Sequence, residues 1–117
     1  MTSPHDLMLQ VDTLLSHVWM VRTFLKHSDE AEDDEELRAV HRGLYDYALS
    51  LGSHYANDDA ESYLKQAKKK FRRLREANDL FQEIQSEISN HTNFKMAARS
   101  LAAAVDDVAE LLDISTN

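Results

Sequence analysis

Six histidines and no cysteine are the residues from which chemistry could be built in this 117-residue chain. Histidine is both the usual metal ligand and the usual acid–base group near neutral pH. The absence of cysteine removes thiol catalysis, disulfides and cysteine-ligated zinc. No histidine, serine or acid stands in a recognised catalytic or metal-binding motif. The sequence therefore predicts no catalytic residue and no cofactor.

Two histidines are paired with an acid at a spacing of four, which places both side chains on one face of a helix. These pairs are His54 with Asp58 and Glu87 with His91. Each pair falls at an expected helix end, where such residues commonly cap the helix or face water. The two pairs are expected at opposite ends of the molecule, so they cannot share one ion. A structural role is favoured for both.

His41 is the histidine expected to be partly buried, because it falls on the apolar side of its helix. The rise per residue places His17, on the flank of the first helix, and Asn78, inside the third, at a similar height. Such a polar layer could bind a small ligand or a metal, with Tyr45 or Tyr47 nearby. It could instead be a hydrogen-bonded cluster that fixes helix register. The second interpretation is favoured, because two imidazoles without a carboxylate rarely form a metal site.

The elements that must position these residues are four segments with heptad-spaced apolar side chains, a pattern typical of bundle helices. Two glycines and one proline leave little material for tight hairpin turns. Short connections require antiparallel neighbours. We therefore expect an all-α, antiparallel up-down-up-down four-helix bundle. The expected single domain covers residues 1–117, with helices at about 4–27, 35–56, 59–89 and 93–113.

The same pattern assigns helix ends and inner faces. Ser3 is the expected N-cap of the first helix, and Asn57 or Asp58 is expected to cap the third. Arg22 and Lys70, near the core edges, are expected to lay their alkyl stems on the core and keep their charges in water. The expected inner face of the first helix consists of Leu7, Val11, Leu14, Val18, Val21 and Leu25. The expected inner face of the second consists of Leu37, Val40, Leu44, Ala48, Leu51 and Tyr55.

Charge is strongly segregated along the chain. Seven of the eight residues in 29–36 are acidic, and we call this stretch the acidic segment. Seven of the thirteen basic residues lie within 65–75. Five of them should point away from the core and form a basic stripe: Lys65, Lys68, Lys69, Arg72 and Arg75. The acidic segment of one copy could meet the basic stripe of another and give a two-fold dimer.

The first helix carries further apolar residues, Leu9, Met20 and Phe24, off its main stripe, with Trp19 on the other flank. Exposed apolar residues at helical spacing often mark a partner surface. We therefore expect contact with a second copy or another protein through these residues and the basic stripe. The favoured function is a non-enzymatic protein-interaction or homo-oligomerising module, ahead of a ligand-binding or metal-binding bundle around His41.

A formal charge of −8 opposes general attraction to nucleic acid and to anionic lipid. The basic stripe leaves weak nucleic-acid binding as a third hypothesis, although it lacks interleaved aromatic residues and a recognition-helix pattern. No apolar run of 18 residues predicts a membrane span. Together with the absence of cysteine and of a signal-like N-terminal segment, this favours the cytoplasm.

Overall fold

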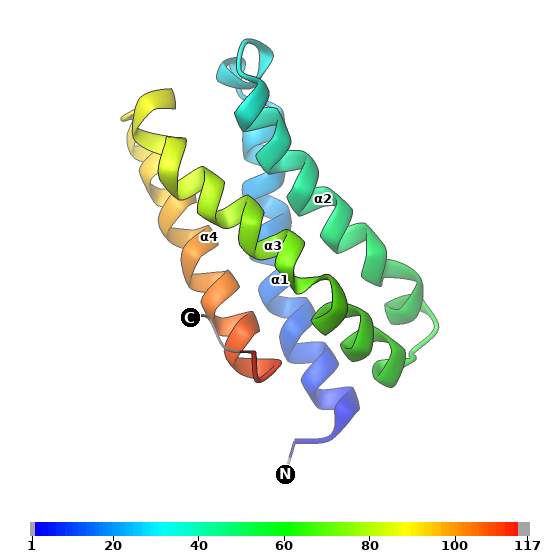
Figure 1. The fold of residues 1–117 in the computed structure, drawn as a ribbon. Coiled ribbons are helices and arrows are strands. Elements are labelled where there is room, and N and C mark those ends of the chain that lie inside the picture. The colour runs from blue at the N-terminus through cyan, green and yellow to red at the C-terminus, as the bar shows by residue number, and fades with distance from the viewer. Residues whose placement is uncertain (1, 115–117) are drawn as a thin grey trace.

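The computed structural model describes residues 2–114 and contains four long α-helices joined by short connections. Figure 1 shows that successive helices run in opposite directions, so the predicted all-α antiparallel bundle is confirmed. The expected helix limits agree to within two residues, and residues 1 and 115–117 of the expected domain lie outside the described residues. The elements are α1 (Pro4–Lys26), the short 3₁₀ helix η1 (Asp29–Glu32), α2 (Glu35–Ala56), α3 (Ala60–Ile88) and α4 (Thr92–Leu111).

Side-chain caps define where α1 and α3 begin. The Ser3 hydroxyl accepts a hydrogen bond from the backbone N–H of Asp6 at 3.1 Å, so the predicted cap of α1 is confirmed. The cap of α3 is Asp59 rather than Asn57 or Asp58. The chain reverses through Asp58, whose φ of 54° lies in the left-handed region that Asp tolerates, and this moves the cap one residue onward. Hydrogen bonds from the side chain and backbone of Ser62 hold the pKa of the Asp59 carboxyl below its ordinary value.

The buried face of α1 is wider than a single heptad stripe. Met8 and Leu15 are buried, whereas the expected Leu7 and Leu14 are half-buried. The reason is that α1 packs against α2 and α4 and also meets α3 across the bundle. A helix with three neighbours buries more of its circumference than the two positions per heptad that a coiled-coil seam requires.

The inner face of α2 also differs in part from the expected set. Tyr47 is fully buried, Ala48 is half-buried, and the expected Tyr55 is exposed. Tyr47 tolerates burial because its hydroxyl donates a hydrogen bond to the backbone carbonyl of Ala67 at 2.8 Å. Burial raises the pKa of the Tyr47 phenol well above its ordinary value, so it donates as the neutral group.

Small residues allow α2 and α3 to approach closely. A Cβ atom placed on Gly43 would lie 3.2 Å from the Cβ of Ala77, tighter than ordinary van der Waals contact.

A second tyrosine joins α3 to α1, because the Tyr63 hydroxyl donates to Oδ1 of Asp12 at 2.9 Å. Burial, together with the neighbouring Asp12 carboxylate, raises the pKa of Tyr63 above its ordinary value.

Replacing Tyr47 with phenylalanine should lower the free energy of unfolding by about 1 kcal/mol, because the ring stays buried while one buried hydrogen bond is lost. Urea denaturation followed by circular dichroism measures this change. The control is Tyr55→Phe, at an exposed position of the same helix, which should leave stability unchanged within error. Equal losses in both variants would show that the Tyr47 hydrogen bond contributes nothing of its own.

Candidate functional site

The structure does not bring His17, His41 and Asn78 together. His17 is exposed beside Ser100 of α4, whereas His41 lines a cavity between α1 and α2. Asn78 is buried on α3, where its Oδ1 accepts a hydrogen bond from Gln82. The three residues have different neighbours and line no common cavity. The polar layer considered from the sequence is therefore replaced by three separate polar sites.

The Asn78 site is structural. The Nε2 atom of Gln82 donates to Asn78 at 3.0 Å and to the backbone carbonyl of Ala98 in α4 at 2.8 Å. This pair of bonds ties α3 to α4. One member of each terminal pair has another neighbour: His91 is the N-cap of α4, and Asp58 faces His5 at 3.2 Å on the surface.

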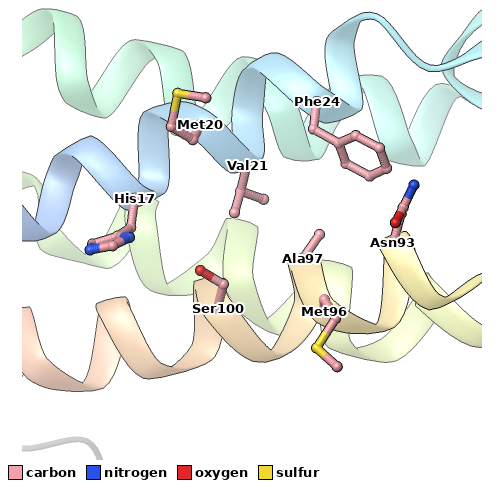
Figure 2. A pocket seen from close by; sticks show the side chains of 8 residues that line it. All are labelled: His17, Met20, Val21, Phe24, Asn93, Met96, Ala97 and Ser100. Carbon is pink, nitrogen blue, oxygen red and sulfur yellow. The ribbon is translucent and has the colours of Figure 1, made fainter.

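A shallow groove of about 350 Å³ separates α1 from α4, and its lining is largely apolar. Val21 and Phe24 of α1 face Ala97 and Asn93 of α4 across it (Figure 2). Phe24, an expected interaction residue, is half-buried because its ring packs edge-on against Phe94 with centroids 5.1 Å apart. Methionines stand at the edges of the groove, where 65% of Met20 and 51% of Met96 are exposed.

The exposed side of α1 carries no charge through its middle. We call the exposed residues of its central three turns the uncharged face: Leu9, Gln10, Thr13, Ser16, His17, Trp19 and Met20. No Asp, Glu, Lys or Arg is among them. By contrast, ten of the twelve exposed residues of α3 are charged, and only Gln82 and Ser86 are not. The uncharged face is therefore a local departure from the protein's generally charged surface.

The basic stripe lies on α3 as expected, but several of its charges are already engaged. Lys65, Lys68, Lys69 and Arg72 are exposed, and Arg72 Nε lies 3.0 Å from Glu76 Oε1. Arg75 is half-buried, with its guanidinium 5.0 Å from the centre of the Phe71 ring. The aromatic residues of α3 are all buried and offer no stacking surface for bases: Tyr63, Phe71 and Phe81.

The acidic segment is an ordered connection rather than an open loop. Its first half forms η1, and Asp34 caps α2 by accepting from the backbone N–H of Leu37 at 2.8 Å. Nη1 of Arg38 donates to the carbonyls of Ala31 and Glu32 at 2.9 and 2.8 Å. These bonds hold the turn against the start of α2 and leave most of its carboxylates at the surface.

A cationic cavity of about 330 Å³ lies between α1 and α2 on the far side from the α1–α4 groove. It is lined by Arg22, Lys26, His41, Arg42 and Tyr45. Burial, followed by the charges of Arg22, Arg42, Lys26 and Arg38, lowers the pKa of the His41 imidazole below its ordinary value. Neutral His41 is thus favoured inside a ring of positive charge.

The guanidinium of Arg22 packs on aromatic rings, whereas the sequence predicted that its charge would stay in water. Its guanidinium lies over both aromatic rings of the α1–α2 interface, 4.7 Å from the Trp19 centroid and 4.6 Å from that of Tyr45. Its Nε atom is buried and has no hydrogen-bond acceptor among residues 2–114. Sequence reasoning missed this cavity because its residues come from two helices. The signal was present as Arg22 and Lys26 at a spacing of four, and as Arg38, His41, Arg42 and Tyr45 on one face of the next helix.

Comparison with protein-family models, with curated proteins and with solved structures gave no match to this chain. Within residues 2–114, no group of three or more His, Asp or Glu side chains is placed to hold a metal ion. Over the same residues, no helix is long and apolar enough to cross a membrane.

The lowered pKa of His41 predicts a loss of stability on the acid side of neutrality. Protonation is disfavoured in the folded state, so this contribution is present above the unfolded histidine pKa of about 6.5 and is lost as the pH falls below it. We expect the drop in unfolding free energy between pH 7.5 and 5.5 to be smaller in His41→Gln than in the wild type. Urea denaturation in chloride buffers measures both.

The matched control is His17→Gln, an exposed histidine on α1. Its pH dependence should follow that of the wild type. If His17→Gln and His41→Gln change the pH dependence equally, the cationic cavity is not the source of the effect.

Proposed function

We propose that the protein is a non-enzymatic interaction module that pairs with a second copy of itself through the uncharged face and the adjoining α1–α4 groove. The observation that carries this proposal is the absence of charged residues among the exposed positions of α1 between Leu9 and Met20. The centres of protein interfaces are depleted in charge and enriched in aromatic residues and methionine. Leu9, Trp19 and Met20 are the large exposed hydrophobic side chains of this face.

A second copy is favoured over a different partner by the charge pattern. In a two-fold contact both copies use the same surface, so charges near the two-fold axis are brought close to identical charges. With a formal charge of −8 per chain, most faces of this protein would repel each other on contact. The uncharged face avoids that repulsion. It is straight and runs for about 17 Å along one helix, which suits antiparallel packing of two α1 helices.

The methionines support the same choice. Methionine is unbranched and adapts its shape to an opposing surface. Met20 and Met96 border the groove from its two helices, so a side chain from the partner's α1 would enter between flexible walls.

The cytoplasm remains the proposed compartment, since a chain without cysteine suits a reducing environment.

Pairing of the acidic segment with the basic stripe is the alternative route to a dimer. It is less favoured, because Arg72 already pairs with Glu76. Nucleic-acid binding by the basic stripe is less favoured again, because the aromatic residues of α3 are buried. Both alternatives are electrostatic and would weaken steeply with salt, whereas contact through the uncharged face would not.

Light scattering behind a sizing column, at low and high salt, tests the proposal. We expect the mass of a dimer in both conditions. Met20→Glu should shift the protein to a monomer, with a dissociation constant at least about tenfold higher, because it places two carboxylates in the contact. A wild-type monomer at all concentrations would rule out self-association, and a dimer that dissociates in salt would favour the basic stripe.

Ser86→Glu is the matched control. It adds the same charge at an exposed, uncharged position, but on α3. Its mass should equal that of the wild type. A monomeric Ser86→Glu would show that net charge, and not the uncharged face, governs association.

A further inference from the structure

The cationic cavity between α1 and α2 is unusual in an acidic protein. Acidic residues outnumber basic ones by 21 to 13, yet the lining of this cavity contains no acid. Three permanent cations converge there, Arg22 and Lys26 from α1 and Arg42 from α2. Among residues 2–114, none of the three forms an ion pair. Like charges gathered without a counter-charge destabilise the free protein, and a bound anion would relieve that repulsion.

The state of Arg22 points to a ligand more directly. The Nε–H of this side chain is a buried donor without an acceptor among the described residues, and such groups are rare and costly in folded proteins. The Trp19 and Tyr45 rings hold the guanidinium plane in place. Stacking on the rings covers the faces of the guanidinium, so the terminal N–H groups at its edge can still meet two oxygens of a phosphate or carboxylate.

The other lining groups add donors of complementary kinds. Lys26 and Arg42 are exposed enough to fold over a ligand, and the Tyr45 hydroxyl can donate a neutral hydrogen bond. Burial and the surrounding cations lower the pKa of His41 in the free protein, and a bound anion would raise it. The volume lies at the small end of ligand sites, so the cavity suits a compact ligand.

We propose that the cavity lined by Arg22, Lys26, His41, Arg42 and Tyr45 binds a tetrahedral oxyanion with two negative charges, either a free inorganic anion or the phosphate group of a small organic molecule. A divalent anion is favoured over a carboxylate because three permanent cations are available to meet it. The lining of the site shares no residue with the α1–α4 groove, although Trp19, which stacks on Arg22, also belongs to the uncharged face.

Sulfate is the first probe, because it keeps both charges throughout the pH range in which histidine titrates. Trp19 is the sole tryptophan, and its ring contacts Arg22, so its fluorescence should report occupancy. Sulfate is titrated at constant ionic strength, with chloride making up the difference. A saturable change in fluorescence is expected. A change that does not saturate, or that chloride reproduces, would overturn the proposal.

Charge-neutralising variants locate the binding. Lys26→Gln and Arg42→Gln should each weaken sulfate binding by about tenfold, since each removes a charge-assisted hydrogen bond. Both residues are exposed, so the fold should be retained. The matched control is Lys69→Gln, an exposed lysine on α3, which should change affinity by less than about twofold. Equal weakening by all three variants would overturn the proposal in favour of diffuse attraction.

The pH dependence tests the part played by His41. Its charged neighbours are Arg22 and Lys26 on α1 and Arg38 and Arg42 on α2, with the Tyr45 phenol completing the wall. Sulfate should bind about threefold or more tightly at pH 5.5 than at pH 8, because the anion favours imidazolium. This difference should disappear in His41→Gln. A pH dependence unchanged in that variant would exclude His41 from the site.

Calorimetric titrations at pH 8 distinguish the two sources of the anion. Equal affinity for inorganic phosphate and phenyl phosphate would assign a free inorganic anion. Tighter binding of phenyl phosphate would assign an organic phosphate whose organic part also contacts the cavity wall. Binding of neither would overturn the proposal.

Discussion

The close packing of α2 against α3 is the contact on which the rest of the bundle depends. A Cβ atom on Gly43 would lie 3.2 Å from the Cβ of Ala77, and the Tyr47 hydroxyl reaches the backbone of α3 further along that helix, at Ala67. One turn before Ala67, the Tyr63 hydroxyl donates to Asp12 of α1. The position of α1 then determines both the α1–α4 groove and the cationic cavity, because α1 supplies one wall of each.

Helix α1 thus presents two surfaces of opposite character. On one flank its exposed residues lack charge and adjoin a groove bordered by methionine, which favours contact with another apolar surface. On the other flank Arg22 and Lys26 face His41 and Arg42 without a compensating acid in the cavity lining. The two proposals for this protein use these two flanks. The groove and the cavity have different lining residues, and Trp19, on the uncharged face and stacked on Arg22, connects the two flanks.

The heptad spacing predicted the four helices well, because two glycines and one proline leave few other ways to bury so many apolar residues. The pattern did not predict which of two adjacent residues, such as Leu14 and Leu15, is the more buried. That depends on how far α1 is rotated toward α4. The rise per residue predicted that His17 and His41 lie close together. The structure separates them, because the two side chains point in different directions around the bundle axis. The cationic cavity was missed because no single segment contains it.

The seam between α1 and α4 brings together parts of the chain that are far apart in sequence. Phe24 and Phe94, whose rings meet there, are separated by 70 residues, whereas Tyr47 and Ala67 are separated by 20. Closing the longer loop costs about 1 kcal/mol more in chain entropy. We therefore expect the α2–α3 hairpin to assemble first and the α1–α4 seam to open first in local fluctuations. A second copy bound along the α1–α4 contact would slow its opening. Association would therefore also protect the folded state against local unfolding.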